Sequence, residues 1–266
     1  MEREVFRRFC HLVHQHAGIR LKDGKEALVC ARLNKRMRAL GLTRFRDYLN
    51  LLEQDASGSE VVQFLDLMST NYTTFFRERE HYDVLAGAVR QWRVAGQRRF
   101  RVWSAACATG EEPYSIAMTM AQVCDDPSLD WRILATDIST RALRQARRGR
   151  YHARAMRSVS RQERLRYFLA DKESDQPCWS IRPEIAARVA FARLNLAITP
   201  FPMRGPFDVI FCRNVMIYLD HEVRRALVSA LETLLRPGGL LMVGHAESLA
   251  GLTSRLGMVH PSTYRH

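Results

Sequence analysis

The sequence predicts an α/β protein with a mostly parallel sheet, preceded by an all-helical domain and interrupted by a small inserted β-subdomain. After about residue 96, short apolar runs alternate with helical stretches, which is typical of βαβ units. Before that point, apolar residues recur at helical spacing. Between 150 and 190 the alternation stops in an arginine-rich stretch with two prolines, which indicates an insertion with its own structure.

The expected domain organisation follows from these changes in pattern. Residues 1–75 are expected to form the helical domain, 76–95 a linker, and 96–266 the α/β domain with its insertion at about 150–190. Three helices are predicted in the first domain. One contains Leu28, Val29, Leu33, Met37 and Leu40 and ends at Gly41; Thr43 is expected to cap the second, which carries Phe45, Tyr48, Leu49 and Leu52; the third carries Val61, Val62, Leu65 and Met68.

In the α/β domain, each expected strand is followed by an expected helix or turn. The predicted strands are 100–106, 131–137, 207–212 and 240–245, and the predicted helices are 110–123, 139–149 and 220–235. Parallel strands joined in this way bring their carboxyl ends to one edge of the sheet, where α/β folds bind ligands.

Composition excludes several classes of protein. No run approaches the ~20 consecutive apolar residues that cross a bilayer, so direct membrane insertion is not expected. The first ten residues, MEREVFRRFC, lack the apolar segment of a secretory signal, which favours a cytoplasmic protein. The six cysteines form no CxxC pair, so free thiols and no metal site are expected. The formal net charge of +13 favours acidic partners.

The segment ACATGEEPYS (106–115) follows the first expected strand. Its small residues let the backbone approach a ligand, Thr109 is a candidate helix cap, and Pro113 suits the first helical turn. Only Gly110 is present, so the segment is not the GxGxxG dinucleotide pattern. Glu111 and Glu112 would repel a pyrophosphate and favour a cationic group. A plain strand-to-helix turn with solvated glutamates remains the simpler interpretation of this segment alone.

Asp137 ends the next expected strand, at an offset of 25 from Glu112. An acidic residue at about this distance from the first loop binds the ribose diol in nucleotide-binding α/β folds. Together these features describe a pocket for a nucleoside that carries a positive charge and no phosphate, such as S-adenosylmethionine. Taken alone, Asp137 is equally compatible with a helix N-cap.

Four segments, taken together, resemble one family. NYTTFFRE (71–78), SAACATGEEPYSIA (104–117), FCRNVMIYL (211–219) and the Pro-Gly-Gly turn at 237–239 occur in the order seen in the chemotaxis-receptor glutamate methyltransferases of the CheR type. RLNKRMRALGL (32–42) is similar to the basic second helix of that family. The resemblance covers about residues 5–248 and implies a class I methyltransferase fold, in which the inserted subdomain can dock on receptors.

The resemblance also implies site residues. It assigns S-adenosylmethionine, with S-adenosylhomocysteine as product and no metal, to the following residues: Asn71, Thr73, Arg77, Glu111 or Glu112, Asp137, Asn195, Leu196, Asn214 and Val215. The implied acceptor is a glutamate carboxylate on the helical bundle of a methyl-accepting chemotaxis receptor. We expect Arg77 to hold that carboxylate and Tyr218 to assist, although Arg77 is also placed to pair with Glu78 or Glu80.

The basic residues of the helix at 28–40 are the expected receptor-docking surface. Its cations are Arg32, Lys35, Arg36 and Arg38, opposite the apolar face, and a merely solvated face is the alternative. We expect the protein to act as a monomer.

Two other functions are compatible with parts of the sequence. A nucleic-acid methyltransferase is suggested by the net charge and by ten arginines against one acid between Arg141 and Arg166, but the Asn214-Val215 segment is not a Pro-Pro-Tyr adenine clamp. A non-catalytic receptor-docking regulator is the other, and the matching residues at every cofactor position argue against it.

Overall fold

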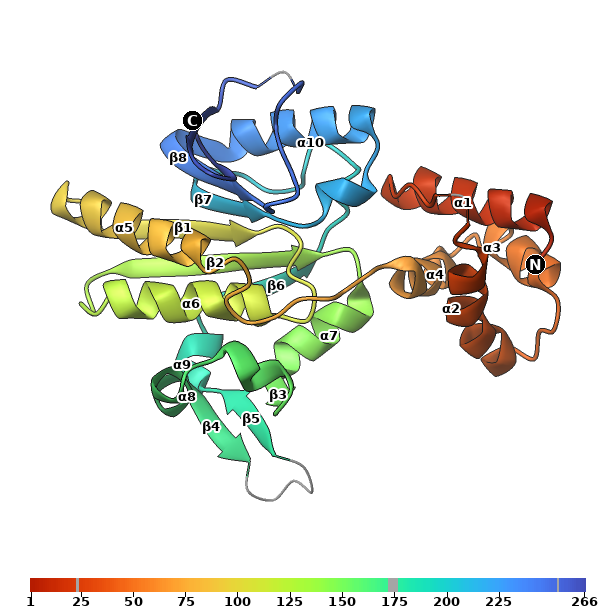
Figure 1. The fold of residues 1–266 in the computed structure, drawn as a ribbon, viewed down its shortest axis with the longest axis horizontal. Coiled ribbons are helices and arrows are strands. Elements are labelled where there is room, and N and C mark those ends of the chain that lie inside the picture. The colour runs from red at the N-terminus through yellow and green to blue at the C-terminus, as the bar shows by residue number, and fades with distance from the viewer. Residues whose placement is uncertain (23, 172–176, 253) are drawn as a thin grey trace.

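The computed structural model describes residues 1–22, 24–171, 177–252 and 254–266 (Figure 1). It confirms the predicted fold class: a helical N-terminal domain stands beside a mostly parallel α/β domain, and a small antiparallel sheet projects from the latter. Among the described residues, no helix combines the length and the apolar character needed to cross a membrane.

The N-terminal domain packs its helices around one apolar core. Its helices are α1 (Arg3–Ala17), α2 (Glu26–Ala39), α3 (Phe45–Glu53) and α4 (Ser59–Met68). Phe9, Leu33, Tyr48 and Phe64 are almost completely buried there. The expectation that Thr43 caps the second predicted helix is wrong, because α3 begins after Arg44 and no side chain caps it.

The α/β domain is built on a seven-stranded sheet in the order β6-β2-β1-β7-β8-β10-β9. Its strands are β1 (Arg99–Ser104), β2 (Asp130–Asp137), β6 (Val189–Arg193), β7 (Phe207–Cys212), β8 (Leu235–Val243), β9 (Gly257–His260) and β10 (Thr263–Arg265). The first five are parallel to one another, whereas β10 is antiparallel to both β8 and β9. From β1, the chain adds β2 and β6 on one side, and then β7 and β8 on the other side. The loop after β1 therefore lies at the point where the strand order changes direction, which is where α/β folds bind ligands.

Helices cover both faces of this sheet. They are α5 (Glu80–Val94), α6 (Glu111–Val123), α7 (Thr140–Arg148) and α10 (His221–Leu234), with the short η2 (Met216–Tyr218) after β7. Alternate residues of β7 belong to different cores: Val209 packs with α5 and α6, and Ile210 packs with α10. This alternation explains why residues 209–212 of β7 are continuously apolar in sequence.

The residues expected to form a linker, 76–95, are mostly helical. Tyr82, Leu85 and Val89 of α5 are buried in the same core as β1 and α6. The extended connection between the two domains lies earlier, after Met68, where residues 69–74 belong to no helix or strand. The apolar residues of α5 therefore pack into the α/β core, and α5 is part of the α/β domain rather than a linker.

The insertion contains a three-stranded antiparallel sheet. Its elements are β3 (Arg150–His152), η1 (Ala155–Ser158), α8 (Arg161–Tyr167), β4 (Phe168–Asp171), β5 (Cys178–Ile181) and α9 (Pro183–Ala186), with the strand order β3-β5-β4. Tyr151 and Phe168 pack edge-on against Phe75, at 4.8 and 5.5 Å between ring centroids, and so anchor the insertion to the main core.

The two domains meet through contacts that are far apart in sequence. Asp66 of α4 accepts hydrogen bonds from the Thr140 hydroxyl (2.6 Å) and the Arg141 backbone amide (3.3 Å) at the start of α7. His14 contacts Asp220 (2.5 Å), the residue that caps α10. A carboxylate at a helix N-terminus is electrostatically favourable, so these contacts hold the domains by the ends of two helices.

We expect Gly110→Ala to lower the free energy of unfolding by roughly 1–3 kcal/mol, because a residue with a side chain is strained at positive φ. Gly110 has φ +100°, and an added Cβ would lie 2.7 Å from the Tyr151 hydroxyl and 2.9 Å from the Ala146 Cβ. Urea titration measures the change. Gly87→Ala is the matched control, since Gly87 lies in α5 with no atom within 4 Å of an added Cβ. Equal effects of the two changes would contradict this account.

Candidate functional site

A cavity of about 540 Å³ opens between the two domains at the carboxyl ends of β1, β2 and β7. This volume is within the range of sites that hold a small molecule or cofactor. Residues from both domains line it, so neither domain alone contains the complete site.

The structure brings most of the predicted site residues together around this cavity. Those that line it are Arg32, Asn71, Thr73, Arg77, Glu112, Asp137, Asn195, Leu196, Asn214, Val215 and Tyr218. Glu111 does not line it: the carboxylate of Glu111 accepts a hydrogen bond from Thr109 (2.6 Å). Thr109 therefore does not cap α6, whose N-cap is Gly110.

Arg213, which the sequence analysis did not select, is the centre of the charge arrangement. Its side chain is almost completely buried and lies 2.9 Å from a carboxylate oxygen of both Glu112 and Glu78. It also donates to the backbone carbonyl of Arg77. Burial acts to lower the pKa of Arg213, but the carboxylate of Glu112 and the neighbouring groups outweigh it and raise the pKa, so the guanidinium stays charged.

The two carboxylates beside Arg213 respond differently to burial. Desolvation raises the pKa of Glu112, although Arg213 and a 2.8 Å hydrogen bond from Ser104 oppose the increase. Desolvation also acts on the less buried Glu78, but Arg213 outweighs it and the pKa of Glu78 is lowered. Glu112 is thus the carboxylate that gains most from a further positive group in the cavity.

Asp137 supports the loop after β1 as well as lining the cavity. Its two carboxylate oxygens each accept a 2.8 Å hydrogen bond from a backbone amide, one from Ala108 and one from Ser139. Burial raises the pKa of Asp137. The N-cap of α7 is Ser139, whose hydroxyl accepts from Ala142, so Asp137 does not cap that helix.

Glu247, a second residue missed from the sequence, organises the loop that follows β7. Its carboxylate accepts hydrogen bonds from the backbone amides of Gly244 (2.6 Å), Asn214 (2.7 Å) and Met216 (2.7 Å). One buried carboxylate therefore fixes the backbone of the loop that carries the cavity residues Asn214, Val215, Ile217 and Tyr218. The signal in the sequence was an acid two residues after the expected final strand, which alone is not specific.

Backbone strain is concentrated around the cavity. Among the described residues, five other than glycine have positive φ, and four of them are Phe76, Glu78, Ala108 and Asn214. Each residue of this kind costs on the order of 1–3 kcal/mol and persists only where its surroundings determine it. Hydrogen bonds from Arg213 and to Glu247 hold parts of this strained backbone in place.

The N-terminal domain contacts cavity residues directly. The Asn195 side-chain amide donates to the His16 carbonyl (2.6 Å), and the Arg20 amide donates to the Tyr218 carbonyl (2.8 Å). Ile19 and Leu219 form an isolated antiparallel bridge between these segments. The position of the helical domain is thereby tied to the loop that carries Tyr218.

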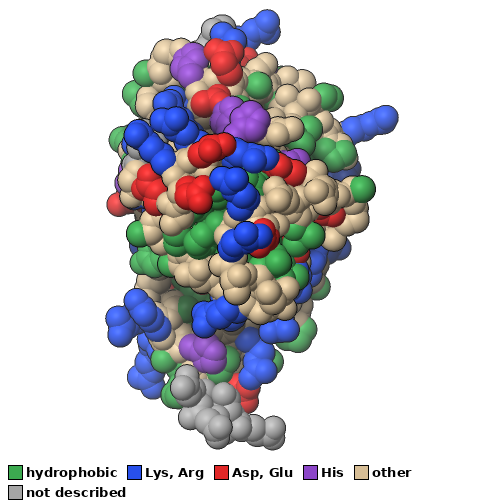
Figure 2. Space-filling model, turned by 90° about the vertical axis from the view of Figure 1, so that its right-hand side faces the viewer, with side chains coloured by type: hydrophobic (Ala, Val, Ile, Leu, Met, Phe, Trp, Pro, Cys, Tyr) green, Lys and Arg blue, Asp and Glu red, His purple; other side chains and the backbone are tan. Residues whose placement is uncertain are grey.

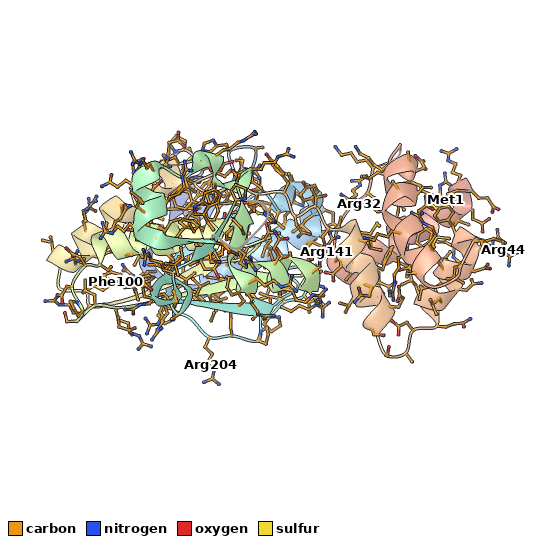
Figure 3. All side chains as sticks on the ribbon, turned by 90° about the horizontal axis from the view of Figure 1, so that it is seen from below. Met1, Arg32, Arg44, Phe100, Arg141 and Arg204 are labelled. Atoms are coloured by element: carbon orange, nitrogen blue, oxygen red, sulfur yellow. The ribbon has the colours of Figure 1, made fainter. Side chains whose placement is uncertain are left out.

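The four cations predicted on α2 do not form one free surface. Arg36 makes a two-point ion pair with Glu60 of α4, and Glu60 is buried. Arg32 donates to the Met68 carbonyl (2.6 Å) and the Thr70 hydroxyl (3.1 Å) at the domain junction, where Figure 3 shows it near Arg141. Only Lys35 and Arg38 are exposed, so the expected outward stripe is wrong for Arg36.

Arg77 does not form the ion pair with Glu78 or Glu80 that the sequence also allowed. Its side chain is half-buried and lines the cavity, and it makes a 3.4 Å hydrogen bond to the Tyr72 carbonyl. Within the part of the chain that the structure describes, Arg77 has no carboxylate partner; Glu78 pairs with Arg213 instead. Its guanidinium is available to an anion that enters the cavity.

Comparison with known proteins identifies this architecture in both domains. Residues 4–69 match the family model described as "CheR methyltransferase, all-alpha domain", and residues 71–265 match "CheR methyltransferase, SAM binding domain". The two matches meet at residues 69–71, within the extended connection before α5.

Curated relatives cover nearly the whole chain. The "Chemotaxis protein methyltransferase" of Escherichia coli is 42% identical over 97% of this chain and 89% of that protein. The protein of the same name from Salmonella typhimurium is 40% identical over 97% and 88%, and that of Borreliella burgdorferi is 32% identical over 97% and 92%.

We expect Arg213→Met to lower the free energy of unfolding by about 3–5 kcal/mol, because it leaves buried carboxylates without their counterion. Adding Glu112→Gln should recover part of this loss, since it removes one of the unpaired charges. Arg225→Met is the control: Arg225 pairs with Glu222 on the surface, and loss of such a pair changes stability by about 1 kcal/mol or less. Denaturant unfolding of the three variants tests the prediction, and similar losses for Arg213→Met and Arg225→Met would contradict it.

Proposed function

This chain belongs to the CheR methyltransferase family, and from that premise we propose that it transfers a methyl group from S-adenosylmethionine to glutamate side chains of methyl-accepting chemotaxis receptors. The product of such a transfer is a glutamyl methyl ester. The observation that carries the proposal is the distribution of charge around the cavity. The α/β side, called the acidic half, holds the carboxylates of Glu112 and Asp137 together with Arg77 and Arg213, whereas the described charged residues of the helical domain that line the cavity, called the cationic half, are all cations.

The acidic half fits S-adenosylmethionine, which supplies a methyl group on a positively charged sulfur. Glu112 is placed to receive the cationic methionine end, and Asp137 to receive the ribose hydroxyls. The amide oxygen of Asn71, which also lines the cavity, is buried and has no hydrogen-bond partner among the described atoms. A buried acceptor of this kind is costly unless a ligand donates to it.

The cationic half fits an acidic acceptor. The helical domain contributes Arg20, Lys22, Lys25 and Arg32 to the cavity wall, and no acid among its described residues lines it. Opposite signs on opposite walls favour a cationic donor on one side and a carboxylate on the other.

The chemistry requires alignment rather than a general base. A glutamate carboxylate, with an ordinary pKa of about 4.3, is already the nucleophile at neutral pH. Arg77 can hold it through two parallel hydrogen bonds, and Tyr218 also lines the cavity. Arg213 supports this arrangement because it binds both the Arg77 carbonyl and Glu112. The residue proposed to hold the acceptor and the residue proposed to hold the donor are therefore fixed relative to each other by one guanidinium.

Features outside the cavity favour a protein acceptor over nucleic acid. Figure 2 shows lysine and arginine side chains interspersed with acidic ones on the end of the molecule formed by the helical domain, rather than one continuous basic band. Several arginines between 141 and 166 are used within the protein: Arg150 pairs with Asp171, and Arg147 and Arg164 donate to backbone carbonyls.

Transfer of labelled methyl from S-adenosylmethionine to receptor-containing membranes tests the proposal. We expect label in the receptor band that is released by mild base, because esters are base-labile and amides are not. Asp137→Ala should abolish both transfer and calorimetric binding of S-adenosylhomocysteine. Base-stable label, label on RNA instead of receptor, or unchanged binding by the Asp137 variant would overturn it.

We expect Arg77→Ala to reduce methyl transfer by roughly 100-fold or more, because misalignment of the reacting groups has effects of this size. Receptor binding, measured by co-sedimentation with membranes, should change little. Arg79→Ala is the matched control, since Arg79 is exposed and contacts the insertion rather than the cavity. Turnover within a few-fold of wild type would show that Arg77 is not the carboxylate anchor.

We expect charge reversal at Lys22 and Lys25 to lower kcat/KM for receptor by roughly tenfold at low salt, because attractive charges accelerate encounter. The difference should shrink as ionic strength rises and the Debye length falls to ~8–10 Å. Lys35→Glu with Arg38→Glu is the matched control, being exposed on α2 but outside the cavity. Reversal of Arg36 is unsuitable, since it would place an acid against buried Glu60. Equal losses in both double variants would indicate a general charge effect.

A further inference from the structure

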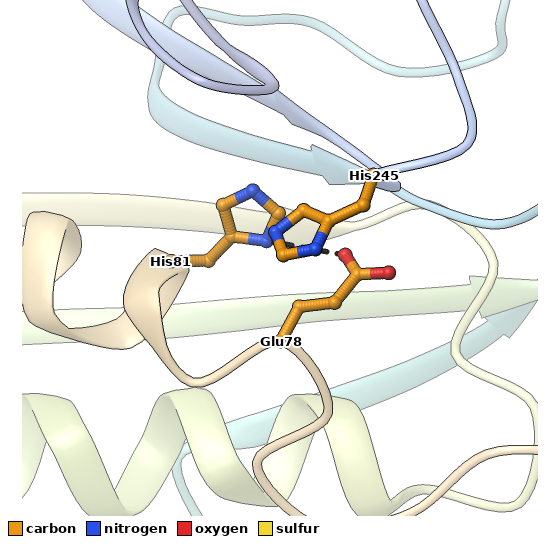
Figure 4. A group of neighbouring side chains, drawn as sticks. All are labelled: Glu78, His81 and His245. Atoms are coloured by element: carbon orange, nitrogen blue, oxygen red, sulfur yellow. Dashed lines mark ion pairs between the residues drawn. The ribbon is translucent and has the colours of Figure 1, made fainter.

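Beside Arg213, three side chains converge that do not line the cavity. Glu78 precedes α5, His81 lies in its first turn, and His245 follows β8 (Figure 4). One ligand atom from each lies within 4.8 Å of the other two. We propose that Glu78, His81 and His245 form a binding site for one divalent transition-metal ion of the zinc class.

The state of His81 is the first argument. The residue is 1% exposed, and neither ring nitrogen has a hydrogen-bond partner among the described residues. A buried polar group without a partner costs about 1–3 kcal/mol, and a metal ion bound to one nitrogen would remove part of that cost.

The geometry of the three side chains is the second argument. His81 Nδ1 lies 3.5 Å from a Glu78 carboxylate oxygen, close to the separation of two ligands on a single tetrahedral ion. The His245 ring lies 5.3 Å from the His81 ring, and His245 is exposed, so its side chain can adjust. Two imidazoles and one carboxylate, with a fourth position open to water, are a donor set typical of zinc and its neighbours.

The local charge permits a cation despite Arg213. That guanidinium is 2.9 Å from Glu78, but it is shared with Glu112 at the same distance. The formal charge of these three groups is therefore negative before any ion binds. An ion at Glu78 would compete with Arg213 for the carboxylate, which links this site to the network beneath the cavity.

Cobalt(II) titration of untagged protein, first dialysed against a chelator, tests the proposal. We expect visible absorption bands typical of low-coordinate cobalt with nitrogen and oxygen ligands, at one ion per chain, and their loss on addition of one equivalent of zinc. His245→Ala should weaken cobalt binding by roughly tenfold or more, because it removes a ligand from an exposed position that the fold does not need.

His152→Ala is the matched control, because His152 is an exposed histidine on β3, far from the cluster in sequence. The affinity of the His152→Ala variant for cobalt should equal that of the wild type. Absence of the absorption bands, equal affinity of the His245 and His152 variants, or a thiolate-to-cobalt band that reports binding at cysteines would each overturn the proposal. None of these outcomes depends on whether the chain methylates receptors.

Discussion

The buried guanidinium of Arg213 is the interaction on which the site depends. It joins Glu112, which comes from the start of α6, to Glu78, which comes from the segment before α5. It also holds the backbone of Arg77. One positive charge in the loop after β7 therefore joins two segments that are remote in sequence, at residues 77–78 and at Glu112. The energetic cost of leaving buried carboxylates unpaired keeps these segments together.

Glu247 has a similar role in the loop after β7. It satisfies backbone amides of the loop after β7, where Asn214 has a positive φ of 57° and a side chain at Gly244 would collide with the Asn214 amide. The strained backbone around the cavity is therefore held by two buried charged groups. Such a site is rigid before its ligands arrive, which is what a reaction based on alignment requires.

The helical domain completes the site instead of only presenting a docking surface. Its contacts to Asn195 and Tyr218 hold it at the cavity, where Arg20, Lys22 and Lys25 contribute to the wall. The proposed docking surface consequently moves from the outer face of α2 to the cavity wall. Arg36 contributes to the stability of the helical domain through its pair with Glu60.

Periodicity in the sequence was sufficient to predict the helical and α/β parts, the insertion, and the order of β1, α6, β2, α7, β7, α10 and β8, but not α1, β6, β9 or β10. Short motifs, together with the family resemblance, predicted most of the side chains that gather at the strand ends. These features depend on local spacing, which a linear pattern contains. The packing of α5 in the α/β core was not predicted, because the spacing of its apolar residues does not indicate which core they join.

Only the tertiary structure decided which charged residues are neighbours. Glu111 and Glu112 are adjacent in sequence, yet a helix turns them in different directions, and only Glu112 reaches the cavity. Arg36 and Glu60, or Glu78 and His245, meet because helices and strands pack at particular angles. Ion pairs, shared carboxylates and ligand clusters depend on distances of a few ångströms between segments that are remote along the chain, and no local pattern in the sequence records such distances.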